Sequence, residues 1–240
     1  MNSGLYAALT GNLTAMRRLD VVSNNLANAN TAGFKQDRLA FQSLLANTAP
    51  SAAQGDSPVM AGERFYTDFS QGPLKQTGNS LDLAIEGDGF FVVQTANGPA
   101  YTRQGNFGRN AAGRLINADG LEVQGAGGPI TINGSSVDIN VRGEVSVDGV
   151  RVGALQIVDF PQPYTLQKIG SSLFVPAEQT APQPAANARV SQGFTENSNV
   201  SVIKEMVQMI ETSRYFETCQ RVVQNYDSMT SKAANELGKI

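Results

Sequence analysis

The first stretch of the chain has apolar residues at helical spacing. From residue 3 to residue 29 they recur mostly every three or four positions, at Leu5, Leu9, Met16, Leu19, Val22 and Leu26. This period places them on one face of an α-helix. The pattern predicts an amphipathic helix whose apolar face must be covered by another helix or another chain.

A longer stripe of the same kind lies at the other end of the chain. Its members are Val200, Ile203, Val207, Ile210, Val223, Tyr226, Met229, Ala233 and Leu237. Their spacing is close to a heptad repeat over about forty residues, several times the length of an average helix in a globular protein. The pattern predicts a helix of coiled-coil type over 199–240, with Asn197 or Asn199 as its N-cap.

Between these ends the periodicity changes. Gly, Asn and Asp separate short runs of Val, Ile, Leu, Phe and Tyr, as in "VSVDGVRVGALQIVDF", where Asp148-Gly149 divides two alternating segments. Further turn signals are Ala112-Gly113 and Asp119-Gly120, and Asn117 is interpreted as an exposed turn residue. We expect a hairpin-rich β domain over residues 65–180.

Stretches rich in Pro, Ala, Gln and Ser flank the expected β domain. Such compositions are typical of extended connections. The expected layout is an N-terminal helix and signature turn over 1–46, a linker over 47–64, the β domain over 65–180, a linker over 181–198 and a C-terminal helix over 199–240. The expected fold class is α+β, with two long helices of coiled-coil type bracketing an all-β domain.

Composition limits the possible partners. The chain has 240 residues, is 41% hydrophobic and carries a formal net charge of −3, so it has no electrostatic footprint for nucleic acid. It has no apolar run long enough to span a membrane, and its first residues lack the pattern of a cleavable signal peptide. We expect neither membrane insertion nor Sec-dependent export. The single cysteine, Cys219, is interpreted as a small packing residue.

The chain contains no histidine, which excludes Ser-His-Asp and Cys-His catalysis and imidazole metal sites. The densest acidic group consists of Asp82, Glu86 and Asp88 in "LDLAIEGDGFFVV". Apolar and polar residues alternate there, which predicts a half-buried strand with Asp82, Ala84 and Glu86 on its outer face. Since no phosphate-binding loop is found either, we expect no catalytic residue, metal, cofactor or small-molecule substrate.

The stretch "SNNLANANTAGFK" carries more asparagines than a solvated helix surface needs, since Asn holds helix poorly. Asn24 and Asn28 form an i, i+4 pair and Asn25 lies beside the apolar face. An amide both donates and accepts, so we expect these three residues to pair between copies of the chain and to specify assembly more than monomer stability. The alternative is that they only fray and end the helix. Asn30 to Gly33 indicate a helix stop, followed by Phe34 as a hydrophobic anchor.

Three segments carry a resemblance to a known family. "SNNLANANTAGFK", the central "QTGNSLDLAIEGDGFFVVQ" with "GPAYTRQGNFGRNAAGRLINADGLEVQG", and "NVSVIKEMVQMIETSRYFET" resemble the bacterial flagellar basal-body rod and hook family. The resemblance implies an assembly signature, made of Asn24, Asn25, Leu26, Ala27, Asn28, Asn30, Thr31, Gly33 and Phe34. It also implies an assembly stripe on the helices, made of Leu5, Leu9, Leu19, Val22, Val200, Ile203, Val207, Ile210, Val223 and Tyr226.

The resemblance also implies a function. Such proteins assemble through their terminal helices into a helical drive shaft that crosses the periplasm and transmits torque to the hook. The implied partners are copies of the chain, other rod proteins and the flagellar type III export apparatus. The length and both ends are most similar to a proximal-rod member, and a distal-rod or hook-like member is the alternative.

Two readings from other classes stay open at this point. A carboxylate-dependent enzyme acting on peptidoglycan would use Asp82, Glu86 and Asp88. A non-axial soluble protein would pair its end helices within one chain.

Overall fold

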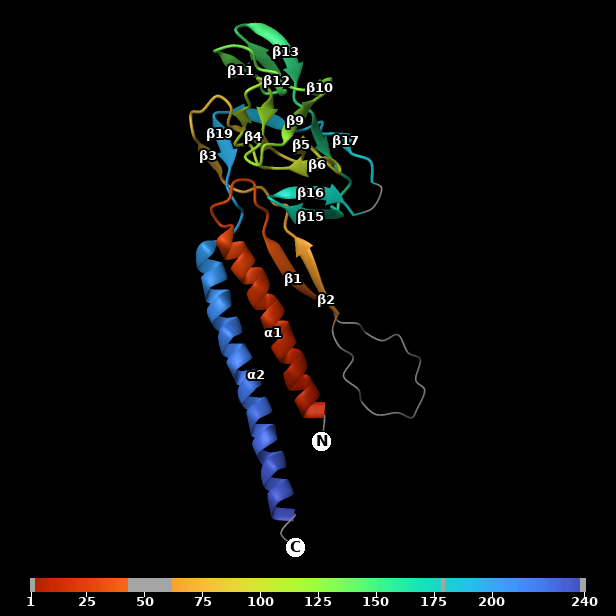
Figure 1. Cartoon of the computed structure of the whole chain (residues 1–240), viewed down its shortest axis with the longest axis vertical. Helices are drawn as coiled ribbons and strands as arrows, with labels where there is room; N and C mark the ends of the chain where they lie inside the picture. The colour runs from red at the N-terminus through yellow and green to blue at the C-terminus, as the bar shows by residue number, and fades with distance from the viewer. Residues whose placement is uncertain (1–2, 43–61, 178–179, 238–240) are drawn as a thin grey trace. The chain divides into compact units, whose positions relative to one another are not determined.

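The computed structural model describes residues 3–42, 62–177 and 180–237 (Figure 1). They fall into two compact units. The helical unit comprises Met1–Ala27, Asp37–Asp68 and Ser201–Ile240, and the strand unit comprises Asn28–Gln36 and Phe69–Val200. No described helix is long and apolar enough to cross a membrane.

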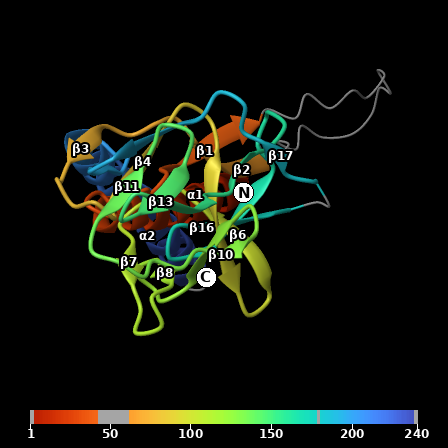
Figure 2. The ribbon, with the colours of Figure 1, turned by 90° about the horizontal axis from the view of Figure 1, so that it is seen from above.

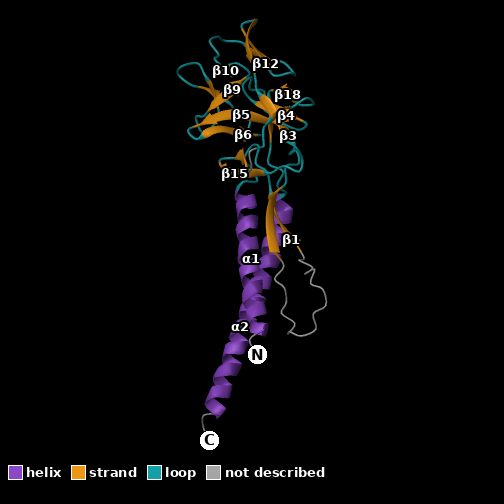
Figure 3. Cartoon of the chain, turned by 90° about the vertical axis from the view of Figure 1, so that its right-hand side faces the viewer, coloured by secondary structure: helices purple, strands orange, loops and turns teal. Residues whose placement is uncertain are grey.

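The helical unit contains two helices and a two-stranded ribbon. The helices α1 (Ser3–Ala27) and α2 (Val202–Leu237) lie side by side (Figure 3, purple). The strands β1 (Asp37–Gln42) and β2 (Gly62–Thr67) pair antiparallel. The hydroxyl of Thr67 donates to the Asp37 carboxylate across this ribbon at 2.7 Å.

Small and polar residues form the contact between the two helices. The buried side chains of α1 include Ala8, Ala15 and Val22, spaced seven apart, and those of α2 are Glu205, Thr212 and Cys219, also spaced seven apart. Two glycines of α1 give the hydroxyls of α2 room. A Cβ on Gly4 would lie 2.4 Å from Tyr226 Oη, and one on Gly11 would lie 2.8 Å from Tyr215 Oη.

The expected α+β fold class with helices of coiled-coil type is wrong. The described residues form two helices and nineteen strands, so the fold is mainly β with one helix at each end, and a coiled coil is not shown. Several large apolar residues of the expected stripe are exposed, with Leu9 at 44% and Ile203 at 77%. The reason is that each helix carries two rows at near-heptad spacing, and the buried row is the one of small and polar side chains.

One large sheet forms the centre of the strand unit. Its strands follow the order β15-β16-β6-β5-β9-β8-β7, with β14 also paired to β5 and β17, and β10 paired to β9. Figure 2 shows β7 and β8 next to each other at one edge. The strands are β5 (Phe90–Thr95), β6 (Gly98–Thr102), β7 (Gly108–Arg109), β8 (Leu115–Ile116), β9 (Glu122–Gly125), β10 (Gly128–Pro129), β14 (Ile157–Asp159), β15 (Leu166–Gly170), β16 (Leu173–Pro176) and β17 (Gln183–Pro184).

Three smaller sheets complete this unit. The strands β11 (Val137–Ile139), β12 (Glu144–Val147) and β13 (Val150–Ala154) form an antiparallel meander. The strand β4 (Leu83–Glu86) pairs with β18 (Arg189–Gln192), and β3 (Leu74–Gln76) pairs with β19 (Phe194–Glu196). Residues 181–198, expected as a linker, therefore contribute three strands. Most of the other expected linker, 47–64, lies outside the described residues.

The strand β5 separates two hydrophobic cores. Phe91 and Val93 belong to the larger core, whereas Phe90 and Val92 belong to a second, aromatic core. In the aromatic core the ring of Phe90 meets that of Tyr164 nearly edge-on, with centroids 5.7 Å apart, a favourable arrangement for aromatic pairs. This strand is buried on both faces for that reason.

The strand β4 is also buried on both faces, because Leu83, Ala84 and Ile85 are all inaccessible. The expectation of a half-buried strand with Ala84 on an outer face is wrong. The paired strand β18 covers one edge of β4, and the large core packs on its side chains.

The hairpin turns follow the sequence signals. Asp148-Gly149 joins β12 to β13, with positive φ angles of 50° and 82°, as a two-residue turn of type I′ requires. At Asp119-Gly120, the side chain of Asn117 accepts hydrogen bonds from Asp119 N and Leu121 N at 3.0 and 2.8 Å. Asn117 is buried, so its interpretation as an exposed turn residue is wrong.

Candidate functional site

Three distant segments meet inside the strand unit. We call this meeting point the signature junction and define it by Gly33, Lys35, Arg103 and Glu196. The Glu196 carboxylate is fully buried and accepts from Lys35 Nζ at 2.5 Å and from Gly72 N at 2.9 Å. Its second oxygen lies 3.4 Å from Arg103 Nη1. Two cations and one carboxylate are thus held together away from water.

Backbone carbonyls take up further donors of these cations. Lys35 Nζ donates to Ser70 O at 2.8 Å, and Arg103 Nη2 donates to Gly87 O at 2.7 Å. The Arg103 guanidinium also lies 5.3 Å from the centre of the Phe90 ring, within the range of a cation–π contact. Buried charges need such partners because an unpaired buried charge is very costly.

Gly33 allows the N-terminal segment to enter the junction. Its φ is +66°, and a Cβ there would lie 2.4 Å from Gln104 N and 2.5 Å from Arg103 C. Its N–H donates to the carbonyl of Glu196 at 2.7 Å. Both the backbone conformation and the close approach require glycine. The following residue, Phe34, is buried, as expected of an anchor.

Asn25 belongs to the helical unit and is buried at the last turn of α1. Its Nδ2 donates to Asp37 O at 2.8 Å and to the Glu205 carboxylate at 3.2 Å, and its Oδ1 accepts from Asp37 N at 3.0 Å. Donors and acceptor of this amide therefore bond within the chain and tie α1 to β1 and α2.

The remaining signature residues lie around the end of α1. Asn24, Ala27 and Asn30 are exposed, whereas Leu26, Asn28 and Thr31 are half-buried. Asn28 and Thr31 form a turn, in which the Thr31 hydroxyl donates to Asn28 Oδ1 at 3.2 Å. The assembly role expected for these residues stays a prediction.

The residues of the expected assembly stripe differ in exposure. Leu5, Leu19, Val200 and Val223 are half-buried and Val22 is buried, whereas Leu9, Ile203, Val207, Ile210 and Tyr226 are exposed. Val200 lies in the strand unit, before α2 begins. Some of the exposed large apolar side chains of α1 and α2 form what we call the outward apolar rows, made of Leu9, Leu13 and Met16 on α1 and of Ile203, Met206, Val207 and Ile210 on α2.

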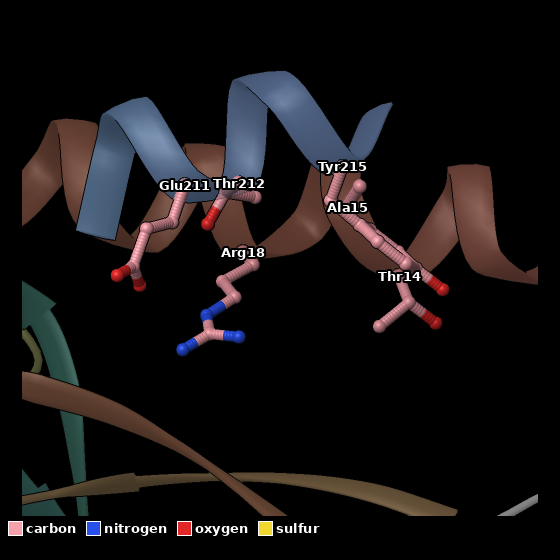
Figure 4. A pocket seen from close by; sticks show the side chains of 6 residues that line it. All are labelled: Thr14, Ala15, Arg18, Glu211, Thr212 and Tyr215. Carbon is pink, nitrogen blue, oxygen red and sulfur yellow. The ribbon is translucent and has the colours of Figure 1, made fainter. Parts of the chain in front are cut away.

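A groove of about 330 Å³ runs along the pair of helices. Thr14, Ala15 and Arg18 line it from α1, and Glu211, Thr212 and Tyr215 line it from α2. Figure 4 shows the side chains of Arg18 and Glu211 extending to the same open side. The Cys219 side chain, which is buried next to Gly11, raises the pKa of the Tyr215 hydroxyl through a hydrogen bond. Cys219 thus packs in the helix contact, as expected.

The three candidate carboxylates are not assembled into a catalytic group. Asp82 accepts from Asn79 Nδ2 at 3.3 Å, Glu86 accepts from the Ser191 hydroxyl at 2.5 Å, and Asp88 is exposed at a bend. Among the residues that the structure describes, no three His, Cys, Asp or Glu side chains are grouped as a metal site would need.

Comparison with known families places the three segments. The model described as "Flagella basal body rod protein" matches residues 5–35, "Flagellar hook protein FlgE/F/G D1 domain" matches 84–147, and "Flagellar basal body rod FlgEFG protein C-terminal" matches 191–237. The Flagellar basal-body rod protein FlgF of Caulobacter vibrioides is 38% identical over the whole of both chains. This chain belongs to the flagellar basal-body rod protein family.

Further full-length relatives support this assignment. The FlgF protein of Rhizobium meliloti is 35% identical over 99% of both chains. The FlgG protein of Bacillus subtilis is 31% identical over 98% of this chain and 99% of its own. The predicted resemblance to the basal-body rod and hook family is confirmed by these relatives, and the family is one of structural rod proteins, so the enzymatic alternative falls away.

Sequence reasoning missed the charged centre of the junction. It gave no role to Lys35, Arg103 and Glu196, and it interpreted Asn199 only as an N-cap, although α2 begins at Val202. A signal was present, because each of these residues lies in or next to a segment that carries the family resemblance. Local periodicity does not reveal that residues 35 and 196 meet.

Proposed function

We propose that this chain is a subunit of the proximal part of the flagellar rod and that it assembles through its terminal helices. Full-length similarity to proteins named FlgF supports the proximal assignment. A structural role in the basal-body rod follows from the family.

The outward apolar rows are the observation that carries the mode of assembly. Ile203 is 77% exposed and Ile210 is 55% exposed on α2, and Leu13 is 56% exposed on α1. Rows of exposed apolar side chains typically mark surfaces that bind another protein. Copies of the chain and other rod proteins are the partners that fit this surface.

A contact between unlike faces of successive subunits produces an open helical filament if the rotation does not close a ring. In such an arrangement the subunit transmits motor torque toward the hook. We infer that the chain reaches the periplasm through the flagellar type III export apparatus.

The experiment replaces Ile203 and Ile210 together by Ser in a flagellated strain that lacks its own copy of the protein. Both side chains are exposed, so the isolated chain should keep its fold, while basal-body yield and motility should be lost. The matched control is Val150→Ser, which removes a 67% exposed apolar side chain from β13. Normal rods from the double variant, with export monitored separately, would refute assembly through this surface.

A further inference from the structure

The chain passes between its two units four times. The passages lie at Ala27/Asn28, Gln36/Asp37, Asp68/Phe69 and Val200/Ser201. Each passage is a single backbone segment, which can rotate about its own φ and ψ dihedrals. The contacts that the strand unit makes with the residues next to the passages therefore determine how freely these segments rotate.

One side chain joins the residues at three of the passages. Asn199 Oδ1 accepts from Gln36 N at 2.8 Å, next to the second passage. Asn199 Nδ2 donates to Ser70 O and to Ser70 Oγ, both at 3.1 Å, next to the third passage. Asn199 itself lies one residue before the end of the strand unit at the fourth passage. All three residues belong to the strand unit.

The chemistry of this position favours asparagine. The side chain must accept from an N–H through one atom and donate to a carbonyl through another, which a short amide does. An ionised carboxylate has no donor, and an aliphatic group has neither donor nor acceptor. Asn197, two residues earlier, has the same side chain but uses its backbone N–H, which donates to Pro73 O at 2.9 Å.

The signature junction makes further hydrogen bonds to the same segments. Lys35, directly before Gln36, donates to the carbonyl of Ser70 at 2.8 Å and to the buried carboxylate of Glu196. The N–H of Asn199 also faces Phe34 O at 3.4 Å. The segments 33–36, 70–72 and 196–199 are thus tied to one another side by side.

We propose that Asn199 is a positioning residue that ties three of the passages into one joint. Torsional load is then shared by three backbone segments and does not twist each segment separately. The load-sharing role rests on the proposed function as a rod subunit. The joint itself does not, because it is a property of the isolated chain.

The first test is hydrogen exchange of the purified full-length chain, with Asn199→Ala compared with Asn197→Ala. Loss of the Asn199 acceptor should speed exchange at the Gln36 amide about ten- to a hundredfold, whereas Asn197→Ala should leave it unchanged. Circular dichroism checks that both variants keep their helices. Wild-type exchange at Gln36 in Asn199→Ala would overturn the joint, whatever the function of the protein.

The second test is swimming in media of increasing viscosity. Cells with Asn199→Ala should build basal bodies and swim in dilute medium but lose speed at high viscosity more steeply than cells with Asn197→Ala. If exchange is faster but swimming is unchanged at every viscosity, the load-sharing role is wrong. If the Ile203→Ser/Ile210→Ser variant also swims normally, the proposed function fails instead.

A second variant keeps the proposal testable if Asn199→Ala does not fold. Asn199→Asp retains an acceptor for Gln36 N but cannot donate to Ser70. We expect near-normal protection of Gln36 and reduced swimming at high viscosity. Wild-type swimming of this variant at all viscosities would overturn the role of the Ser70 contact.

Discussion

At the scale of residues, the most consequential side chain is the buried carboxylate of Glu196. It faces Lys35 and Arg103, and the side chains of all three residues are almost inaccessible. Removing one member of a buried charge pair costs far more free energy than removing one member of an exposed pair, because the remaining charge stays buried without a partner. A substitution of Glu196 should therefore strongly destabilise the strand unit.

We expect Glu196→Gln to destabilise the strand unit by about 3 to 5 kcal/mol. The measurement is urea unfolding, monitored through the hydrogen exchange of peptides from β5 and β6. Glu122→Gln is the control, because Glu122 pairs with Arg114 at the surface, where an ion pair contributes little. Equal stability of the two variants would show that the buried cluster is not needed.

Tyr164 gives the aromatic core a dependence on pH. Burial raises the pKa of its hydroxyl to about 12, and the hydrogen bond to Asp159 adds to the shift. Above the ordinary value of about 10, the unfolded chain loses this proton while the folded chain keeps it. The free energy of unfolding should therefore fall as the pH rises from about 10 to about 12. Tyr164→Phe should show a flatter decline over this window in urea unfolding, and an unchanged slope would contradict the assignment.

At the scale of elements, the contact between α1 and α2 depends on small side chains. Ala15 is 1% exposed in this contact and also lines the groove along the helices, so a larger side chain there must displace its packed neighbours or turn into the groove. Ala15→Leu should destabilise the helical unit by about 1 to 3 kcal/mol. The check is thermal melting by far-ultraviolet circular dichroism, with Met16→Leu as the control because Met16 is exposed. The same melting temperature for both variants would contradict the packing.

How far the sequence predicts these elements differs between helices and strands. The helical period predicted both helices, but it did not predict that small and polar residues form their contact, while large apolar residues such as Ile203 are exposed. Turn chemistry predicted the hairpins at Asp119-Gly120 and Asp148-Gly149, because Gly and Asp determine them locally. The strand β18 was missed, since its pairing with β4 joins residues about a hundred positions apart.

At the scale of the whole molecule, the strand unit begins earlier and ends later than the β domain expected at 65–180. It includes Asn28–Gln36 and continues to Val200. A fragment of residues 65–180 would lack Lys35 and also β18, the partner of β4. We expect this fragment to show weak amide protection in β4, whereas residues 28–200 should protect that strand. Equal protection in the two fragments, measured by hydrogen exchange, would mean that residues 28–36 and β18 do not complete the fold.

The place of the signature residues could be predicted only in part. Family resemblance pointed to the segments, and the αL-tolerant Gly33 was recognised as part of a turn. That Asn25 bonds within the chain was not predictable, because its partners Asp37 and Glu205 lie on elements that periodicity does not bring together. The double change Asn25→Ala/Asn28→Ala should consequently weaken the monomer as well as assembly.

We propose that this chain is a subunit of the proximal rod and that its helices make the contacts between subunits. The most direct measurement is an electron cryomicroscopy reconstruction of basal bodies that contain this chain. Density for the chain is expected in the proximal rod, with Ile203, Val207 and Ile210 in contact with neighbouring subunits. Density for the chain elsewhere, or a rod in which these side chains face solvent, would contradict it.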